Sequence, residues 1–205
     1  GLISNTIYST CQVPKGIVAT GNNGISYIKN YNKIVTYDIS SDEYNSCVYD
    51  YNLDALWLST SNSGIKLFDL NSGKLIEAYT TYNGLSNNEV YNLHLDDKSN
   101  LWVSTDGGGV SIFNGQFWSN LDSYDGLISN TIFDINQIST DQFLISGQSG
   151  YSIYTKRNNK PILNPPNIIG AKIDDDRYTV PLNSSIYLQL QPVDYITNSK
   201  KFIFR

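Results

Sequence analysis

Three polar residues recur about 42 residues apart on stretches of sequence that are otherwise apolar, and they are the first candidates for chemistry: Asp50, Asn92 and Asp134. A carboxylate or amide on an apolar strand can bind a hydroxyl-rich ligand through paired donors and acceptors. Each is preceded by an aromatic residue that would add a ring face to such a site: Tyr49, Tyr91 and Phe133. The structural alternative is that these side chains cap turns or bind water along a wet channel.

A second candidate set lies in turns and connections that we expect to share one face of the molecule: Asn62, Tyr82, Asn88, Asp106, Tyr124 and Asn130. Amides, carboxylates and tyrosine suit sugar hydroxyls, which need paired donors and acceptors and an apolar ring face. The structural alternative, which we favour for any single Asn, is that these turns need side-chain-to-backbone hydrogen bonds and positive φ. Asn88 and Asn130 occupy equivalent places in two copies of a repeat, which favours that alternative further.

Evidence for catalysis is thin. His94 is the single histidine and has no Ser or Cys partner nearby in the sequence. Paired carboxylates for glycoside cleavage remain an open alternative. The run Asp174–Asp176 lacks the Gly and Glu of a calcium loop and is better interpreted as a solvated hairpin tip. Without a metal-spaced Cys/His cluster, phosphate loop or nucleophile motif, we predict no catalytic residue, metal site or cofactor.

Composition narrows the possible partners. The 205 residues carry a formal net charge of -5 and only 16% charged residues, so we expect no nucleic-acid partner. The sequence has no stretch of 18 apolar residues and no signal-peptide pattern. It starts at Gly1 and ends in the apolar run Phe202–Arg205, so we expect a piece of a longer protein, with membrane contact only through regions outside it. We interpret Cys11 and Cys47, which lie at non-equivalent repeat positions, as two free thiols.

The elements that position these residues form a repeat written four times, over 1–41, 42–83, 84–125 and 126–156. In each copy a hydroxyl residue is followed four positions later by Gly and then by apolar residues: Thr20 and Gly24, Thr60 and Gly64, Thr105 and Gly109, Ser146 and Gly150. Repeats of this length that are built from short strands indicate β-propeller blades.

The third copy predicts one blade in full. Alternation and turn residues predict strands over 90–95, 101–105, 110–113 and 116–121, which form a four-stranded antiparallel meander. A blade buries its faces only against its neighbours. We therefore expect a recurring large residue to pack between blades rather than to stack on a sugar: Ile17, Trp57, Trp102 and Phe143.

After the repeats, residues 157–167 hold three prolines and read as a linker. Residues 168–205 return to strand patterns and predict the N-terminal part of an immunoglobulin-like β-sandwich. The predicted class is therefore all-β throughout. Four blades are fewer than the roughly six to eight of the larger closed propellers. Further blades would precede Gly1, which is the simpler option, or two chains would assemble.

The segments Gly84–Val90, Asn100–Val110 and Gly126–Ile132 resemble the two-component-regulator propeller repeat, with its Gly-Leu opening and its Leu-Trp strand. The resemblance runs from Gly1 to about Tyr154. The second copy has Asp42-Glu-Tyr in place of the Gly-Leu opening, and the fourth has Phe143 in place of Trp. The tail is similar to the start of the three-Tyr (Y_Y_Y) β-sandwich that follows such propellers.

This resemblance implies a sensor segment on the periplasmic or extracellular face of a bacterial inner-membrane protein, followed by a membrane helix and a kinase or other output domain. It further implies an oligosaccharide ligand and possible self-association of the whole receptor as a dimer. We therefore expect a ligand-sensing segment of a two-component or hybrid signal-transduction receptor without catalysis of its own. The alternatives are a propeller enzyme acting on polysaccharide and a protein-interaction platform.

Overall fold

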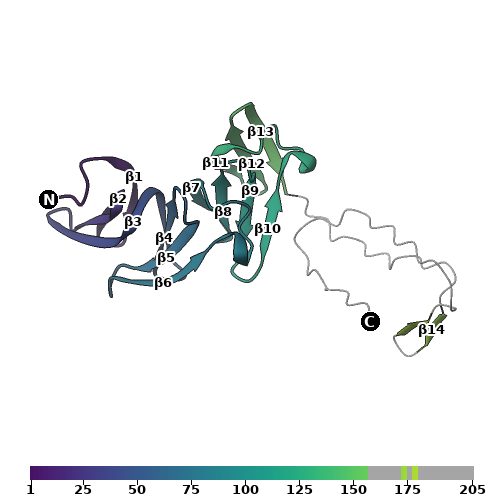
Figure 1. The fold of residues 1–205 in the computed structure, drawn as a ribbon, viewed down its shortest axis with the longest axis horizontal. Coiled ribbons are helices and arrows are strands. Elements are labelled where there is room, and N and C mark those ends of the chain that lie inside the picture. Colours follow the sequence, from purple (N-terminus) through teal and green to yellow (C-terminus); the bar gives the residue numbers. More distant parts are fainter. Residues whose placement is uncertain (157–171, 175–176, 180–205) are drawn as a thin grey trace. The chain divides into compact units, whose positions relative to one another are not determined.

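The computed structural model describes residues 1–156, 172–174 and 177–179. The chain divides into two compact units, Gly1–Lys156 and Arg157–Arg205 (Figure 1). In the second unit, β14 (Lys172–Asp174) and β15 (Arg177–Thr179) form an antiparallel pair. The predicted linker and most of the predicted sandwich lie outside the described residues.

Blades 2 and 3 are four-stranded antiparallel meanders, as predicted. Blade 3 contains β7 (Val90–Leu95), β8 (Leu101–Thr105), β9 (Val110–Phe113) and β10 (Trp118–Leu121), paired in chain order. Blade 2 contains the second half of β3 (Lys33–Asp50), β4 (Ala55–Thr60), β5 (Ile65–Asp69) and β6 (Lys74–Tyr79). The short 3-10 helices η1 (Thr81–Asn83) and η2 (Ser123–Asp125) lead from blades 2 and 3 to the next blade.

Blade 1 contains two long strands, and each of them supplies two consecutive strands of the repeats. The first half of β2 (Gly16–Lys29) pairs with β1 (Ile7–Val13), and its second half pairs with the first half of β3, which then continues into blade 2. Blade 4 has three described strands, β11 (Ile132–Ser139), β12 (Gln142–Gly147) and β13 (Gly150–Thr155). The described sheets are all antiparallel, so the all-β prediction is confirmed.

The recurring glycine before the third strand is required because the next strand leaves no room for a side chain. A Cβ atom at Gly64 or Gly109 would lie 2.1 Å from the carbonyl oxygen of Tyr79 or Leu121. Both glycines also adopt a φ of 75°, which residues with a side chain rarely do. The repeat signature therefore records a close approach between the start of the third strand and the end of the fourth strand of a blade.

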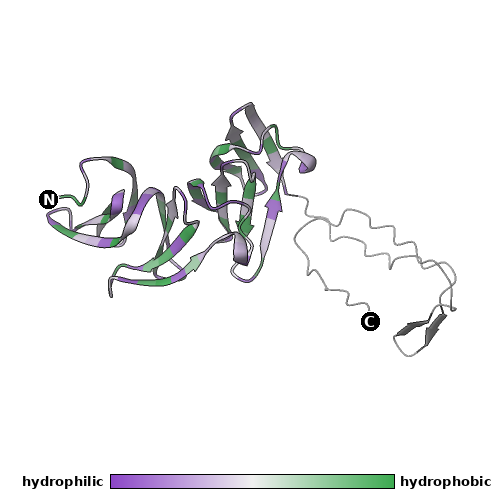
Figure 2. Ribbon diagram, viewed as in Figure 1, coloured by the Kyte–Doolittle hydropathy of each residue, from purple (hydrophilic) through white to green (hydrophobic). Residues whose placement is uncertain are grey.

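The apolar core lies between blades rather than within one of them. Trp57 of blade 2 is 1% exposed and packs with Leu101 and Val103 of blade 3, while the fully buried Trp102 packs with blade 4. The prediction that both tryptophans are core residues is confirmed. Figure 2 shows hydrophobic and hydrophilic residues interleaved along the strands.

The strand register corrects the predicted alignment of the copies by one residue. In each blade a second-strand hydroxyl donates to a first-strand carbonyl, from Thr20 to Ser9, from Ser59 to Ser46, from Ser104 to Asn92 and from Ser146 to Asp134. Thr20 and Ser146 are thus equivalent to Ser59 and Ser104. The expectation that Ile17 and Phe143 share the position of the two tryptophans is therefore wrong.

The offset has a simple cause in blade 4. The turn after its second strand joins Gly147 to Gly150, whereas the turn in blade 3 joins Thr105 to Gly109 and is one residue longer. Counting four residues back from the glycine therefore reaches a different position of the second strand. The residues that stand where the tryptophans do are Val18 in blade 1 and Leu144 in blade 4.

Cys11 and Cys47 form a disulfide bond, so the prediction of two free thiols is wrong. Cys11 lies in the first strand of blade 1 and Cys47 in the first strand of blade 2, with their Cα atoms 5.8 Å apart. Both side chains face the cluster between these blades. The two cysteines occupy different repeat positions because they approach one interface from opposite sides, and the bond joins the innermost strands of two blades.

The Gly-Leu opening of a copy places an apolar side chain between blades. Leu85 is 3% exposed and Leu127 is 7% exposed, each within the cluster shared with the preceding blade. Blade 2 lacks this opening, and there Lys66 forms an ion pair with Asp42 and donates to Tyr44 Oη at 3.0 Å. In blade 2 the ion pair between Lys66 and Asp42 therefore holds the connection that the Gly-Leu opening holds in blades 3 and 4.

Among the described residues, no helix has the length and apolar character of a membrane span.

Candidate ligand-binding surface

Each first strand contains a β-bulge near its start, which leaves one residue without a partner on the second strand. The extra residues are Tyr8, Asn45, Tyr91 and Phe133. Tyr8 is 41% exposed and Phe133 is 49% exposed, and the rings of Tyr91 and Phe133 lie 5.6 Å apart between centroids. The bulges therefore bring aromatic rings from three blades to the surface at equivalent places.

We call the surface around these bulges the inner rim, and it comprises the bulge residues and the neighbouring strand ends: Tyr8, Asn22, Glu43, Asn45, Ser61, Glu89, Tyr91, Asp106 and Phe133. Contacts join its residues within blades 1 and 2 and connect blade 2 to blade 3. Tyr8 Oη donates to Asn22 Oδ1 at 3.0 Å, and Ser61 Oγ donates to Glu43 Oε2 at 3.1 Å. Asn45 Nδ2 of blade 2 donates to the carbonyl of Val90 in blade 3 at 2.9 Å.

Three carboxylates give the inner rim a negative charge, and its nine residues include no Lys or Arg. Partial burial and the charge of Glu43 raise the pKa of Tyr8. Partial burial and the charges of Asp106 and Glu89 raise the pKa of Tyr91. Both phenols therefore remain protonated donors beside carboxylate acceptors at neutral pH, which is a pairing that suits hydroxyl groups of a ligand.

Two of the three candidates on first strands meet in the structure. Asn92 Nδ2 donates to Asp134 Oδ1, Ser46 Oγ donates to Asn92 Oδ1 at 2.6 Å, and Asn136 Nδ2 donates to Asp134 Oδ2 at 2.6 Å. These residues belong to the first strands of blades 2, 3 and 4. They form a polar chain from blade to blade, so much of their hydrogen-bonding capacity is used within the protein.

Asp50 lies elsewhere, at the far end of its strand. It is 5% exposed and accepts hydrogen bonds from the backbone N–H groups of Asn52 and Leu53 at 2.9 and 3.1 Å, and from Trp57 Nε1 at 3.3 Å. The turn-capping alternative describes this carboxylate. The residue equivalent to Asn92 in blade 2 is Ser46, because Ser59 binds the carbonyl of Ser46 as Ser104 binds that of Asn92.

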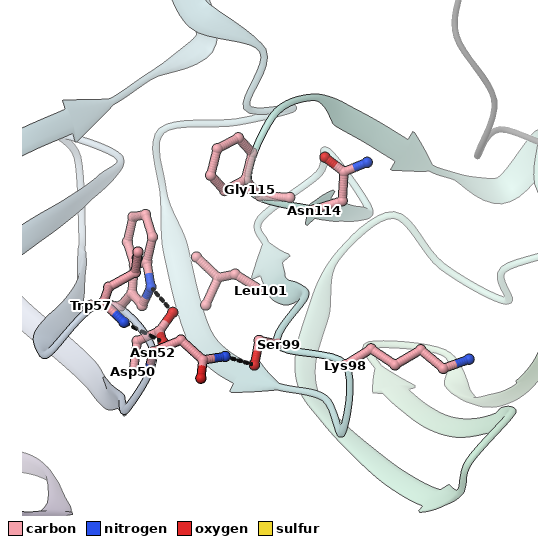
Figure 3. Close-up of a pocket in the computed structure, with 10 residues that line it drawn as sticks. Asp50, Asn52, Trp57, Lys98, Ser99, Leu101, Asn114 and Gly115 are labelled. Atoms are coloured by element: carbon pink, nitrogen blue, oxygen red, sulfur yellow. Dashed lines mark hydrogen bonds between the residues drawn. The ribbon is translucent and has the colours of Figure 1, made fainter.

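Asp50 lines a small pocket between blades 2 and 3, with a volume of about 190 Å³. Figure 3 shows Trp57 and Leu101 on its wall and the hydrogen bond between Asn52 Nδ2 and Ser99 Oγ, which is 2.6 Å long, across its edge. The pocket lies at the turns that follow the first strands, whereas the inner rim lies where the first strands begin. The two surfaces are therefore separate.

The turn candidates divide by their contacts. Asn88 Oδ1 accepts from the N–H of Thr81 at 2.8 Å, and Asn130 Oδ1 accepts from the N–H of Ser123 at 2.7 Å, so these amides hold equivalent connections in place. Asp106 lies in the inner rim and accepts from Thr131 Oγ1 at 2.9 Å. The other three candidates are exposed at connections or turns: Asn62, Tyr82 and Tyr124, the two tyrosines at 98% and 97%.

The histidine is placed for packing. His94 is half-buried, burial lowers its pKa, and its ring meets Phe143 edge-on at 6.4 Å between centroids. Within the part of the chain that the structure describes, no group of three or more His, Cys, Asp or Glu side chains could hold a metal ion.

Sequence reasoning missed Tyr8, Glu43, Asn45, Ser61 and Glu89 as members of one surface. A β-bulge cannot be recognised in an alignment of the repeats, so the sequence does not predict that Tyr8 lies at the surface. A signal did exist in Glu43 and Glu89, each of which directly precedes the first paired residue of its first strand, Tyr44 or Val90.

Comparisons with known proteins agree with this fold. Residues 84–107 match the family model of the two component regulator propeller. The extracellular domain of the putative hybrid two component system BT3049 from B. thetaiotaomicron is similar over 85% of this chain, with 23% identity and a TM-score of 0.63. That of the putative one component system BT4673 from the same organism is similar over 78%, with 22% identity and a TM-score of 0.63. No curated protein sequence matches the chain.

Coverage differs among the similar structures. The match spans 26% of the BT3049 chain and 22% of the BT4673 chain, so the present chain corresponds to about a quarter of those domains. The computationally designed Ika4 protein is similar over 77% of this chain and 96% of its own, with 11% identity and a TM-score of 0.57. At these identities the likeness establishes the propeller-type fold.

Proposed function

We propose that the chain is a ligand-sensing segment of an extracytoplasmic bacterial receptor in two-component signalling, with no catalytic activity of its own. The observation that carries this proposal is the inner rim, where equivalent positions of blades 1, 3 and 4 present aromatic rings beside carboxylates and amides. The match of residues 84–107 and the likeness to extracellular domains of two putative signalling systems support it.

The disulfide supports an extracytoplasmic location. Disulfides persist in the periplasm and outside the cell, and they are rare where the cytosol keeps thiols reduced. The bond between Cys11 and Cys47 joins two blades of the propeller-type unit. We therefore assign the segment to the periplasmic or extracellular face of the inner membrane.

The chemistry of the inner rim favours an uncharged oligosaccharide as the ligand. Tyr8, Tyr91 and Phe133 offer ring faces to the apolar side of a sugar, while Glu43 and Asp106 accept from hydroxyls. A net charge of -5 and a rim without cations would repel sulfated or uronic-acid glycans. A neutral glycan avoids this repulsion.

Calorimetry with neutral and acidic oligosaccharides tests this assignment. Tyr91→Ala should weaken binding of a neutral glycan about tenfold or more, because one stacked ring is lost. Tyr31→Ala is the matched control, since Tyr31 is 64% exposed in a turn outside the inner rim. Binding that is lost instead in Tyr82→Ala and Tyr124→Ala would move the site to the connections between blades.

Product analysis on the same glycans separates sensing from catalysis. A polysaccharide-acting enzyme would release reducing ends, and that release would stop in Glu89→Gln or Asp106→Asn. We expect no release. If the folded chain binds no neutral glycan, the carbohydrate assignment is overturned.

A further inference from the structure

The pocket between blades 2 and 3 has a counterpart between blades 3 and 4, in which the same repeat positions carry related side chains. Ser46 is equivalent to Asn92, as the hydrogen bonds of the second strands show. Four residues further along the chain, Asp50 is therefore equivalent to Asp96. Both carboxylates are buried, and the Oδ1 atom of each accepts from two backbone N–H groups of the turn that follows.

A tryptophan from the second strand lies against each of these carboxylates. Trp57 Nε1 donates to Asp50 Oδ2 at 3.3 Å. Trp102 Nε1 donates to Asp96 Oδ2 at 3.0 Å. The two interfaces therefore share a buried carboxylate that is joined to an indole ring.

An aromatic residue of the next blade completes the shared set. Phe113 of blade 3 pairs with Leu101. Tyr154 of blade 4 pairs with Phe143, at the same two positions of the repeat. The two third-strand rings lie 6.2 and 5.6 Å from the tryptophan of the preceding blade, between centroids. Carboxylate, indole and aromatic ring thus recur together in both interfaces.

The interfaces differ two residues further along the chain, where blade 4 has Lys156 and blade 3 has Gly115. Lys156 Nζ forms an ion pair of 2.7 Å with Asp96 Oδ2 and lies 5.4 Å from the ring centroid of Trp102. Gly115 has no side chain, and a Cβ atom there would meet no atom of the described residues within 4 Å. The space beside Asp50 is therefore the pocket of about 190 Å³, which Gly115 lines.

Asp50 lacks the positive charge that its counterpart has. Within the described residues, no ion pair includes Asp50. Lys98 also lines the pocket, but its Nζ lies 4.0 Å from Asp141 Oδ1 of blade 4, and Figure 3 shows its side chain extending away from Asp50. A buried carboxylate is costly without a compensating cation, so the pocket favours a positively charged ligand.

We propose that this pocket binds a primary alkylammonium group whose nitrogen lies against Asp50 Oδ2, as Lys156 Nζ lies against Asp96 Oδ2. A primary ammonium has N–H donors for the carboxylate, which a quaternary ammonium lacks. The ring of Trp57 adds a cation–π attraction of the kind that Trp102 offers to Lys156. The site goes beyond the glycan sensing proposed for the inner rim, since the two surfaces are separate.

The expected affinity is modest, because the pocket has one ring fewer than its counterpart. Lys156 Nζ also lies 4.7 Å from the ring centroid of Phe143, whereas Leu101 stands at that position beside the pocket. One ion pair and one indole ring on a small ligand correspond to a Kd of about 1 mM. Leu101→Phe should supply the missing ring and tighten binding about threefold, a gain that a fold defect does not produce.

An NMR titration of the full chain with n-butylammonium, which reproduces the end of a lysine side chain, tests the proposal at constant ionic strength. We expect the indole N–H resonance of Trp57 to shift and saturate. The resonance of Trp102 should stay unchanged, because Lys156 fills the equivalent place beside it. n-Butanol is the uncharged control and should shift neither resonance.

Asp50→Asn should weaken binding of n-butylammonium about tenfold or more, because the charge is lost while the size of the side chain is kept. Asp54→Asn is the matched control, since Asp54 is exposed in the same turn and lies outside the lining of the pocket. Lys156→Ala is the positive control. It opens the equivalent place beside Asp96, so n-butylammonium should then shift the resonance of Trp102 and raise the stability of this variant.

Three results would overturn the proposal. The first is a Trp57 resonance that does not move throughout the titration, whether or not Lys156→Ala responds. The second is a shift that n-butanol reproduces, and the third is a shift that Asp50→Asn leaves unchanged, because neither would depend on the charge pair.

Nα-acetyl-lysine amide distinguishes the two sources of such a group. Binding equal to that of n-butylammonium would support a lysine side chain of a peptide as the natural occupant. Binding of n-butylammonium alone would support a free amine, because the hydrogen bond between Asn52 and Ser99 narrows the edge of the pocket. Both results support recognition of a primary ammonium.

Discussion

The interface between blades 1 and 2 and the interface between blades 3 and 4 join the same backbone elements by different chemistry. Between blades 1 and 2, the small Val18 occupies the position of a tryptophan, and the Cys11–Cys47 disulfide joins the innermost strands. Between blades 3 and 4, Trp102 stacks on Phe143 at 4.0 Å between centroids. One interface is held covalently and the other by packing.

An ion pair adds to the second interface. Lys156 of blade 4 lies 4.7 Å from the ring centroid of Phe143 and forms an ion pair of 2.7 Å with Asp96 of blade 3. The comparison teaches that the repeat fixes the spacing of the blades but not the means of joining them. We therefore expect reductant to destabilise the interface between blades 1 and 2 and acid to destabilise the interface between blades 3 and 4.

The largest effect is expected from Trp102→Ala, which removes a fully buried ring from the interface between blades 3 and 4. We expect a loss of about 4 kcal/mol in the free energy of unfolding, measured by urea denaturation, because both transfer and cavity terms are lost. Val18→Ala at the equivalent position of blade 1 should cost about 2 kcal/mol, since less side chain is deleted. Equal losses would contradict the inference that packing contributes more to the interface between blades 3 and 4 than to the interface between blades 1 and 2.

Removing the disulfide should have the next largest effect. Cys11→Ser with Cys47→Ser should cost about 3 kcal/mol, because the unfolded chain regains the freedom of a loop with a sequence separation of 36. Reductant should reproduce this loss in the natural chain and have no further effect on the double variant. Hydrogen exchange should accelerate in β1–β3, and equal acceleration in β11–β13 would contradict a local role.

The repeat and its buried tryptophans could be predicted from sequence because both follow from spacing and polarity. The residue of blade 4 that is equivalent to these tryptophans, Leu144, could not be predicted. Ser146 and Gly150 show the same four-residue spacing as Thr105 and Gly109, but the shorter turn assigns Ser146 to a different register. Spacing alone does not distinguish a shift in a strand from a deletion in a turn.

The disulfide and the inner rim depend on contacts between copies, and for that reason a single copy does not reveal them. Cys11 and Cys47 meet only because one faces forward and the other back across one interface. Among the candidate residues, Asn92 and Asp134 meet because both lie on first strands at one level. The spacing of 42 residues predicts that Asp50 lies at the same level, but in the structure Ser46 occupies that position.

The smallest effect concerns acid. Burial alone would raise the pKa of Asp96, but hydrogen bonds from Lys156, Asn100 and Trp102 outweigh it and lower the pKa to about 2. A carboxyl with a lowered folded-state pKa contributes stability above its unfolded value, near 3.8, and loses it as pH falls toward 2. We expect roughly 2 kcal/mol to disappear over this window, as measured by urea denaturation at successive pH values.

Asp96→Asn sharpens this test, because the variant lacks the titrating group and its stability should vary less between pH 4 and pH 2. Asp97→Asn is the matched control, since Asp97 is an exposed neighbour and its loss should leave the acid profile unchanged. If acid destabilises β1–β3 before β11–β13 in hydrogen exchange, the ion pair does not set the acid limit of the second interface. Loss of protection first in β11–β13 is the expected order, because Asp96 joins blade 4 to blade 3 through Lys156.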